Sequence, residues 1–386
     1  MSAAAEPLIL ALNAGSSSLK WGLFAGAGTA ETQSGEAEWP SGTDGAQDAL
    51  AAVLPSLDPS AIVAIGHRVV HGGARFTAPA ALDAEVRAAI AELSRLAPLH
   101  NPAALAGIDA AAALLPGVPQ VAVFDTAFHQ TMPPEAWRYA LPHGWSESFG
   151  IRRFGFHGIN HQWCAERASA LCGHPASPFR VVTCHLGSGC SLAAVLDGRS
   201  VETTMGYTPM DGIIMATRPG SLDPGILLSL LRAGEMTPEA LDDALNHRAG
   251  LAGLSGGISD MRALLAARSE GDPEAALAIA CFIHALRAGI ARMAAALGGI
   301  DALVFSAGIG EHQPTIREEC CTGLGWMGVA LDLARNADPG ETGEIGAAGA
   351  LARVFVVPAR EVACVARAAW ATTAALRFGE AQSSLL

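Results

Sequence analysis

Basic side chains are scarce in this sequence, and lysine is almost absent. The 386 residues include 24 Lys and Arg against 37 Asp and Glu, and Lys20 is the only lysine. The net charge is −13, and the chain contains no block of basic residues. Both features argue against nucleic acid as a partner. We therefore expect small-molecule partners, with anions bound in local pockets of arginines and backbone N–H groups.

Signals for export and membrane insertion are also lacking. The N-terminal segment MSAAAEPLILALN has no basic region and contains Glu6, so no signal peptide is expected. The most apolar stretch, residues 275–297, contains His284, Arg287 and Arg292, which favours a buried helix over a membrane span. These features predict a cytoplasmic protein without membrane contact.

Zinc-binding patterns are missing as well. The eight cysteines show no CxxC spacing, and several lie in apolar runs such as VVTCHL. Buried free thiols in a reducing compartment are the simplest interpretation. His157 and His161 have the i, i+4 spacing of a metal pair on a helix. Without an HExxH motif, however, zinc-dependent hydrolysis is not predicted.

Three glycine-rich turns, each after a predicted strand, point to phosphate binding. The sequence has neither a Walker GxxxxGK[ST] motif nor a GxGxxG motif that opens a helix, so an ordinary P-loop or dinucleotide site is excluded. The turns are NAGSSSLK at residues 13–20, HLGSG at 185–189 and SAGIGEH at 306–312. Small residues let the backbone approach a phosphate closely, and successive N–H groups form an anion cradle.

The chain pattern predicts an α/β protein with two related halves. Strand–turn–strand patterns at residues 8–24 and 181–196 favour an internal duplication, and Asp197-Gly198 predicts a type I′ hairpin. Strands that alternate with helices are typical of α/β folds. We expect helices at 83–96, 102–115, 161–171, 238–246, 273–297 and 362–376. We expect a first domain over 1–126, onto which the C-terminal helix 362–386 packs, and a second domain over 127–361.

Four side chains are candidates for chemistry on an anion. Arg68 lies in the apolar strand IVAIGHRVV, where alternation places it on the face of Val70. It would either form a structural ion pair or bind an anionic substrate. Arg218 precedes a proline, which places it in an extended loop, and it would be a surface arginine or a second anion ligand.

Asp125 and His157 also have two interpretations each. Asp125 ends the strand VAVFD, where a carboxylate would hold a metal or cap a helix. His157 lies between two glycines in RRFGFHG. It would either be a structural imidazole or lie beside a phosphoryl group.

Taken together, the motifs resemble those of the acetate kinases, within the superfamily of acetate and sugar kinases, heat-shock chaperones and actin. The resemblance is carried, in family order, by NAGSSSLK, GHRVVHGG, PLHNP, FDTAFHQTMP, RFGFHG, HLGSG, TRPGSLDPG and FSAGIGEH. It implies two domains of a duplicated actin-like, ribonuclease H-like fold, with the active site in the cleft between them. It also implies a homodimer and the reversible, Mg²⁺-dependent transfer of the ATP γ-phosphoryl group to acetate, with Mn²⁺ as an alternative metal. The products would be acetyl phosphate and ADP.

The resemblance also implies roles for individual residues. The catalytic residues would be Arg68, Asp125, His157 and Arg218. Asn13 and Glu361 would belong to the metal site. The acid would be bound by Arg68, Val70, Leu99, His100, Phe156 and Pro209. The nucleotide would be bound by His185, Leu186, Gly187, Ser188, Gly189, Asp260, Met261, Arg262, Gly308, Ile309, Gly310 and His312, with Lys20 contacting a phosphate or bracing the first turn.

The chain departs from the family pattern on the nucleotide side. Ser188 replaces the asparagine of HLGNG, His312 replaces that of GIGEN, and Met261 stands where the family has an aromatic residue. Glu361-Val362 replaces a pair of glutamates. We expect these changes to bear on nucleotide preference and rate more than on the reaction itself.

Two alternatives remain open from the residues. A propionate or butyrate kinase would differ only in the volume of the acid pocket, where one methylene is worth roughly 1–3 kcal/mol. A nucleotide-dependent binding module would keep the phosphate turns but would have no use for Arg68, Arg218 and the apolar acid pocket.

Overall fold

The computed structural model describes residues 6–15, 18–27, 30–38, 45–98 and 100–383. The chain divides into two compact units. The first comprises residues 1–130, 156–160 and 360–386, and the second comprises residues 131–155 and 161–359. This division differs from the expected one because residues 127–130 and 156–160 group with the first unit.

The first unit is built on a six-stranded sheet of order β3-β2-β1-β4-β6-β5. Its strands are β1 (Leu8–Ala14), β2 (Ser18–Ala25), β3 (Ala30–Glu38), β4 (Ile62–Val69), β5 (Ala80–Ala81) and β6 (Gln120–Phe124). Strands β1, β2 and β3 form an antiparallel meander, and β4 and β6 continue the sheet parallel to β1. The expected hairpin at residues 8–24 is therefore confirmed.

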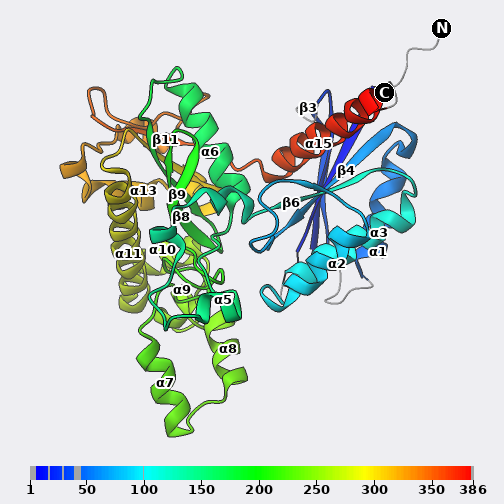
Figure 1. Cartoon of the computed structure of the whole chain (residues 1–386). Helices are drawn as coiled ribbons and strands as arrows, with labels where there is room; N and C mark the ends of the chain where they lie inside the picture. The colour runs from blue at the N-terminus through cyan, green and yellow to red at the C-terminus, as the bar shows by residue number, and fades with distance from the viewer. Residues whose placement is uncertain (1–5, 16–17, 28–29, 39–44, 99, 384–386) are drawn as a thin grey trace. The chain divides into compact units, whose positions relative to one another are not determined.

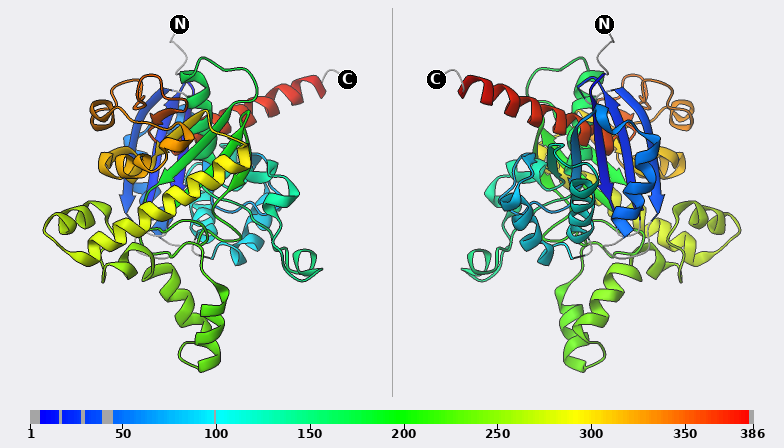
Figure 2. Two further views of the ribbon diagram at one scale, coloured as in Figure 1. Left: turned by 90° about the vertical axis from the view of Figure 1, so that its left-hand side faces the viewer. Right: turned by 90° about the vertical axis from the view of Figure 1, so that its right-hand side faces the viewer.

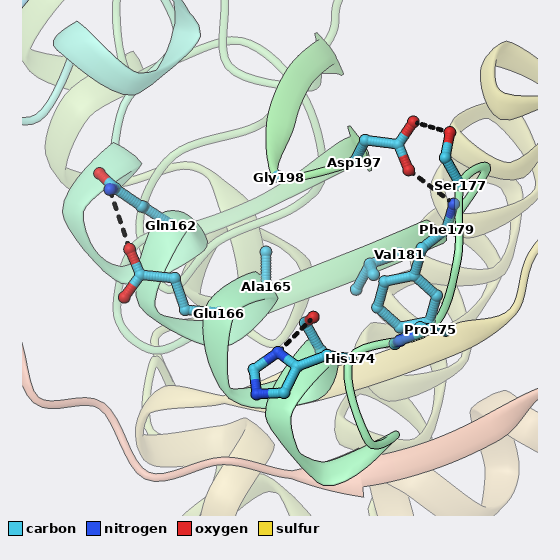
Figure 3. Close-up of a pocket in the computed structure, with 11 residues that line it drawn as sticks. Gln162, Ala165, Glu166, His174, Pro175, Ser177, Phe179, Val181, Asp197 and Gly198 are labelled. Atoms are coloured by element: carbon cyan, nitrogen blue, oxygen red, sulfur yellow. Dashed lines mark hydrogen bonds between the residues drawn. The ribbon is translucent and has the colours of Figure 1, made fainter.

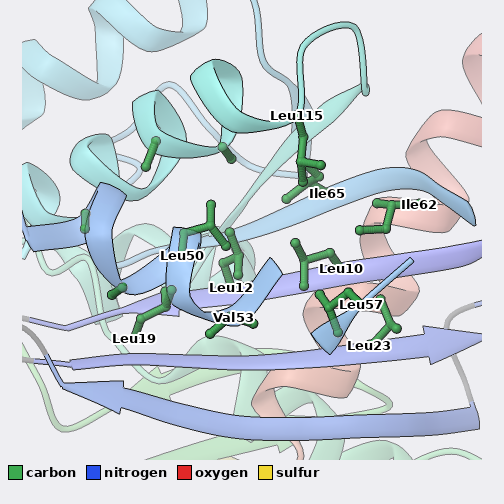
Figure 4. Packing of buried hydrophobic residues seen from close by; sticks show 14 residues of the cluster. Leu10, Leu12, Leu19, Leu23, Leu50, Val53, Leu57, Ile62, Ile65 and Leu115 are labelled. Atoms are coloured by element: carbon green, nitrogen blue, oxygen red, sulfur yellow. The ribbon is translucent and has the colours of Figure 1, made fainter. Parts of the chain in front are cut away.

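Helices cover both faces of this sheet (Figure 1). They are α1 (Gly45–Val53), α2 (Ala84–Glu92), α3 (Asn101–Leu114) and α15 (Glu361–Ser383), with 3-10 turns at Leu54–Ser56, Pro59–Ala61, Leu93–Arg95 and Ala127–Thr131. On one face, Leu10 and Leu12 of β1 pack with Leu50 of α1 and Leu115 (Figure 4). The other face receives α15, whose Val365 leaves no room for a Cβ at Gly66 of β4.

The second unit repeats the same strand plan. Its sheet has the order β11-β10-β7-β8-β9, with β7 (Arg180–Leu186), β8 (Cys190–Leu196), β9 (Arg199–Thr203), β10 (Ala302–Ser306) and β11 (Arg353–Val356). The antiparallel meander β7-β8-β9 corresponds to β1-β2-β3, and the parallel strands β10 and β11 correspond to β4 and β6. This equivalence confirms the predicted duplication.

The local turn chemistry of the second sheet follows the sequence. Asp197 and Gly198 between β8 and β9 both have positive φ, 50° and 78°, as a type I′ turn requires. The strand–turn–strand pattern predicted at 181–196 is the β7-β8 hairpin.

Residues 134–337 form eleven helices, of which those at 158–171, 238–247 and 273–297 match the helices predicted at 161–171, 238–246 and 273–297. They are α4 (Pro134–Trp137), α5 (Trp145–Phe149), α6 (Gly158–Leu171), α7 (Pro224–Ala233), α8 (Pro238–His247), α9 (Gly250–Leu254), α10 (Met261–Ser269), α11 (Pro273–Leu297), α12 (Ala307–His312), α13 (Pro314–Thr322) and α14 (Leu333–Ala337), with a 3-10 turn at Gly325–Met327. The segment SAGIGEH, predicted as a loop, is mostly the short helix α12. Figures 1 and 2 show α7 and α8 as a hairpin that extends from the rest of the second unit.

The long helix α11 lies along the second sheet. Within the described residues it is the one helix long and apolar enough to cross a membrane, a property that buried core helices share. Gly289 of α11 approaches the sheet so closely that a Cβ there would lie 2.5 Å from Leu192 Cδ1 of β8. Figure 2 shows this helix along the strands. All eight cysteines are free, and six of them are buried.

Candidate active site

Arg68 and Asp125 meet at the carboxyl ends of neighbouring parallel strands in the first unit. Arg68 is near the end of β4, and Asp125 directly follows β6. The register places Val69 opposite Phe124, and Asp125 N donates to Val69 O at 3.0 Å. The guanidinium binds the carboxylate bidentately, with Nε to Oδ1 at 3.1 Å and Nη2 to Oδ2 at 2.5 Å.

Two further predicted residues complete this Arg68 cluster, which we define as Asn13, Arg68, Asp125 and Glu361. Arg68 Nη1 donates to Asn13 Oδ1 on β1 at 3.2 Å, and Arg68 Nε lies 3.7 Å from Glu361 Oε2. Glu361 is the first residue of α15, as expected. Burial lowers the pKa of Arg68, but the charges of Asp125 and Glu361 and the Asp125 hydrogen bond outweigh it and raise this pKa above its ordinary value.

The oxygen atoms of this cluster suit a hard divalent cation. Two carboxylates and one amide oxygen converge on a single positive guanidinium. Among the described residues, no group of three His, Cys, Asp or Glu side chains could hold a metal ion. The protein therefore offers a partial oxygen set, which fits Mg²⁺ because that ion commonly takes one or two carboxylates and completes its shell with water and substrate phosphates.

The segment Phe156-His157-Gly158 packs directly on Asp125. Gly158 N donates to Asp125 O at 2.9 Å, and a Cβ at Gly158 would collide with that carbonyl oxygen. His157 is half-buried and adopts a left-handed φ of 55°. The close approach of Gly158 to Asp125 sets the position of His157. The sequence pattern did not identify this contact.

Phe156 of the predicted acid pocket is buried beside a histidine that the sequence analysis did not assign. The Phe156 ring contacts His71 edge-on at 5.4 Å, and its carbonyl oxygen lies 3.0 Å from His129 Nε2. The His71 backbone exchanges two hydrogen bonds with the Asn101 side chain, both at 3.1 Å. Val70 is half-buried at the end of β4.

The remaining predicted acid-site residues are only partly placed. His100 is half-buried at the start of α3. Burial, followed by the charges of Arg95 and His100, lowers the pKa of His71 to about 4. Leu99 lies outside the described residues, and Pro209 belongs to the second unit.

In the second unit, Arg218 is held differently from Arg68. Its Nη1 donates to the carbonyl oxygen of Pro209 at 2.6 Å. Among the residues that the structure describes, no carboxylate forms an ion pair with it, and it is half-buried rather than on the surface. Burial lowers its pKa, and the neighbouring Cys190 opposes this only in part.

The predicted nucleotide residues gather around a cavity of about 460 Å³ in the second unit. This volume is within the usual range for small-molecule sites. The cavity is lined by Gly187, Ser188, Ala216, Ser259, Asp260, Met261, Arg262, Gly308, Ile309, His312 and Gln313. Eight of these were predicted from the sequence, and Ala216, Ser259 and Gln313 were not.

The HLGSG turn beside this cavity is fixed through its backbone. Gly187 N donates to Gly189 O at 3.0 Å, and Cys190 Sγ donates to Gly187 O at 3.2 Å. Ala216 N donates to Ser188 O at 3.1 Å, which ties the turn to the segment that ends in Arg218. Burial raises the pKa of Cys190 to about 12, so this thiol is neutral.

Asp260 and Arg262 form a local structure on the cavity wall. The Asp260 carboxylate caps α10 by accepting from Arg262 N at 2.9 Å and Ala263 N at 3.2 Å. It also accepts from Arg262 Nη2 at 3.0 Å, and this side-chain hydrogen bond is the main cause of a lowered Asp260 pKa. The buried Met261 occupies the first helical position.

The other predicted nucleotide residues do not line this cavity. Leu186 and Gly310 are buried, and His185 lies half-buried at the end of β7 with its ring 6.3 Å from that of His161. Both ring nitrogens of His161 lie 2.7 Å from hydroxyls of Thr183 and Ser191. His161 is therefore engaged by these hydroxyls, and the possible metal pair with His157 is not formed.

Lys20 lies on β2 of the first unit and not among the cavity residues. Its side chain is 58% exposed, and its Nζ is 4.0 Å from Glu36 Oε2 on β3. These contacts favour a surface ion pair, although the predicted nucleotide role stays a prediction. Ser16 and Ser17 of the preceding turn lie outside the described residues.

A second cavity, of about 540 Å³, lies at the opposite end of β7 (Figure 3). Its polar side chains already bind one another or the backbone. Gln162 donates to Glu166 at 3.0 Å, and Asp197 accepts from Ser177 Oγ and Phe179 N at 2.7 and 2.8 Å. This cavity offers no cluster of basic groups for phosphates.

Comparisons with known proteins agree with this arrangement. A model of the acetokinase family matches residues 41–367. The acetate kinase of Gloeobacter violaceus is 45% identical over 94% of this chain and 98% of its own length. The acetate kinase of Thermosynechococcus vestitus is 52% identical over 80% of this chain and 74% of its own length.

Solved structures also match nearly the whole chain. The crystal structure of Porphyromonas gingivalis acetate kinase has a TM-score of 0.85 and 34% identity, and the match covers 95% of this chain and 99% of that one. The crystal structure of a propionate kinase from Francisella tularensis has a TM-score of 0.88 and 34% identity, covering 94% and 98%.

Proposed function

The chain belongs to the acetokinase family, and from that membership we propose how its two units share the work of one reaction. It is a phosphotransferase with a carboxyl group as acceptor, and it transfers the γ-phosphoryl group of ATP to acetate. The products are acetyl phosphate and ADP, and the reaction is reversible. The family uses a divalent metal. The observation that carries our assignment of residues is the Arg68 cluster, where one arginine faces two carboxylates and an amide.

The first unit binds the acid and stabilises the negative charge that develops during phosphoryl transfer. Arg68 binds anionic oxygens through its planar guanidinium, which matches carboxylate and phosphoryl groups bidentately. Val70 and Phe156 contact the methyl group of acetate. His157 donates a hydrogen bond to the transferred phosphoryl group, and Gly158 fixes its position relative to Asp125.

The second unit binds the nucleotide. The Gly187–Gly189 turn presents backbone N–H groups to the phosphates, and the residues around Met261 and Ile309 contact the adenosine. Arg218 supplies the second positive charge. The serine at position 188 donates one hydrogen bond where an asparagine of the family reaches further.

The reaction needs charge stabilisation more than acid–base chemistry. Acetate is already ionised at neutral pH, so no general base is required. Phosphoryl transfer depends on positioning and on neutralising charge at the equatorial oxygens. Arg68, Arg218 and His157 supply this from the protein. A divalent ion, for which we propose Mg²⁺ with Mn²⁺ as a substitute, would be held by Asn13, Asp125 and Glu361 and would neutralise charge on the phosphates.

Acetate is the acid that the relatives support best, because the more identical proteins are acetate kinases and the matched propionate kinase is 34% identical. The test is to trap the acyl phosphate with hydroxylamine in assays with acetate, propionate and butyrate. We expect the highest kcat/KM with acetate. A higher value with propionate would contradict the assignment, and no acyl phosphate from any acid would favour a nucleotide-binding module.

We also propose a cytoplasmic homodimer that associates through α7. None of the residues of α7 is buried. Ile226, Leu228 and Leu231 of this helix, and Leu222 just before it, expose between 39% and 50% of their surface. Free thiols at all eight cysteines are consistent with a reducing compartment. Replacing Ile226 and Leu228 together by aspartate should convert the dimer to a monomer in sedimentation experiments. A dimer that survives this change would place the interface elsewhere.

A further inference from the structure

Arg218 owes its position to the backbone on which it stands. Its guanidinium donates to a carbonyl oxygen, and no described carboxylate pairs with it. No described ion pair would therefore hold the Arg218 guanidinium in place if the main chain shifted. The stretch Met215–Arg218 closes on itself through a hydrogen bond from Met215 N to Arg218 O at 3.0 Å.

The junction between α8 and α9 holds this stretch at three points. Ala249 N donates to Thr217 O at 3.0 Å, and Leu251 N donates to Met215 O at 2.9 Å. Ala252 N donates to Ala216 O, also at 2.9 Å. The start of α9 thus binds the Arg218 stretch with successive main-chain donors.

Thr217 adds a side-chain bond to the same frame. Its Oγ1 donates to Asn246 O near the end of α8 at 2.7 Å. Thr217 immediately precedes Arg218, and its hydroxyl is the only atom of this side chain that can hydrogen-bond. Removal of the hydroxyl would leave the shape of the residue intact in valine while breaking the tie to α8.

Gly250 occupies the point where the two segments come closest. Its φ is +60°, and a Cβ there would lie 2.6 Å from Arg218 O, 2.9 Å from Arg218 N and in collision with Met215 O. These are main-chain atoms, which cannot turn aside as the end of a flexible side chain can. Gly234, which ends α7, has a similar φ of +68° but nothing within 4 Å of its Cβ position.

We propose that Thr217 and Gly250 are positioning residues that set the place of Arg218 in the phosphoryl-transfer site. The proposal rests on the catalytic role of Arg218 given above. It predicts that changes at either position act on turnover, because a displacement of about 1 Å at a transferring group costs ~10²-fold in rate. Binding of the acid should change much less, since Arg68 and Val70 belong to the first unit.

The experiment compares Gly250→Ala with Gly234→Ala, measuring kcat, both KM values and thermal unfolding. Both substitutions place a Cβ at positive φ, so the strain of that conformation is matched. We expect kcat to fall ~10²-fold in Gly250→Ala, with KM for acetate within about 3-fold of wild type. Gly234→Ala should keep wild-type kcat. Equal kcat in the two variants would overturn the proposal.

A second pair of variants tests the proposal even if Gly250→Ala does not fold. Thr217→Val should lower kcat about 10-fold, and Thr217→Ser, which keeps the hydroxyl, should restore it to within about 2-fold. If valine and serine give the same kcat, the hydroxyl does not position Arg218 and the proposal fails.

Arg218→Ala separates this proposal from the one on which it rests. Near-normal turnover in Arg218→Ala would refute the role of Arg218 itself. Loss of turnover in Arg218→Ala, together with normal turnover in Gly250→Ala and Thr217→Val, would refute only the positioning frame.

Discussion

Arg68 and Arg218 lie in different units and reach their places by different means. Arg68 donates hydrogen bonds to Asp125 and Asn13 and forms an ion pair with Glu361 at 3.7 Å. Arg218 has a carbonyl oxygen as partner and a main-chain frame behind it. The opposite pKa directions, raised for Arg68 and lowered for Arg218, follow from this difference.

The contrast shows two ways to pre-position a positive charge for an anion. A carboxylate cage compensates the cost of burying the charge but must share the arginine with its substrate. A backbone frame leaves the guanidinium unpaired and available, at the cost of an uncompensated partial burial. Substitutions that alter charge should therefore act most strongly around Arg68, and substitutions that alter main-chain geometry should act most strongly around Arg218.

The largest effect is expected from removing either arginine. Arg68→Ala and Arg218→Ala should each reduce kcat by ~10²–10³, because loss of one charged donor in such a site costs about 3–4 kcal/mol. Steady-state assays of acetyl phosphate formation measure this. Near-wild-type kcat in either variant would remove that arginine from the mechanism.

The two units should also differ in their response to pH. In the first unit, burial is the main reason that the pKa values of His67, His71 and His129 are lowered to about 4. A depressed pKa favours the neutral form in the folded state, so stability is present above the ordinary value near 6.5 and is lost as pH falls toward 4. Each histidine contributes at most about 3 kcal/mol.

Buried thiols give the second unit the opposite dependence. Burial raises the pKa of Cys190 and Cys320 from 9.0 to about 12. Stability from these groups is present below the unfolded pKa and is lost as pH rises from 9 toward 12. Hydrogen exchange of peptides from each unit should show acid opening first at His71 and alkaline opening first at Cys190. Simultaneous opening of both units at both extremes would contradict this.

A smaller effect is expected at the acid pocket. Val70→Ala adds room for the alkyl chain without changing the Arg68 cluster. One methylene in such a pocket is worth roughly 1–3 kcal/mol. The ratio of kcat/KM for butyrate over acetate should rise. An unchanged ratio would mean that Val70 does not contact the alkyl chain.

The smallest effect is expected at Lys20. Its exposed ion pair with Glu36 belongs to a class worth about 0–1 kcal/mol, and arginine keeps the charge. Lys20→Arg should leave kcat and Tm near wild type. A clear fall in kcat with ATP would instead support the phosphate-turn role that the sequence suggested.

Much of this arrangement was predictable because it depends on short patterns. Strand alternation identified Arg68, and Asp125 followed from its place after an apolar strand. The Asp197-Gly198 turn was predicted directly from turn chemistry. The duplication was visible because both halves begin with a strand–turn–strand pattern.

Other features depend on contacts between distant segments, which local patterns do not encode. Gly158 matters because Asp125 lies against it, and Gly250 because the Arg218 stretch does. Ala216 lines the cavity beside the HLGSG turn, where its N–H donates to the carbonyl oxygen of Ser188, a residue distant in sequence. The segment at 306–312 looked like a glycine loop, but residues 307–312 form α12, in which Gly310 lies close to the backbone of Phe305.

The difference between the two arginines is tested most directly by thermal unfolding of Arg68→Ala and Arg218→Ala, measured side by side. Arg68→Ala leaves two carboxylates without their cation, so we expect a loss of about 3–5 kcal/mol and a clearly lower Tm. Arg218→Ala removes a charge that no described carboxylate balances, so its Tm should stay at or above that of wild type. Equal destabilisation of both variants would show that the two arginines are held in the same way and would contradict the account.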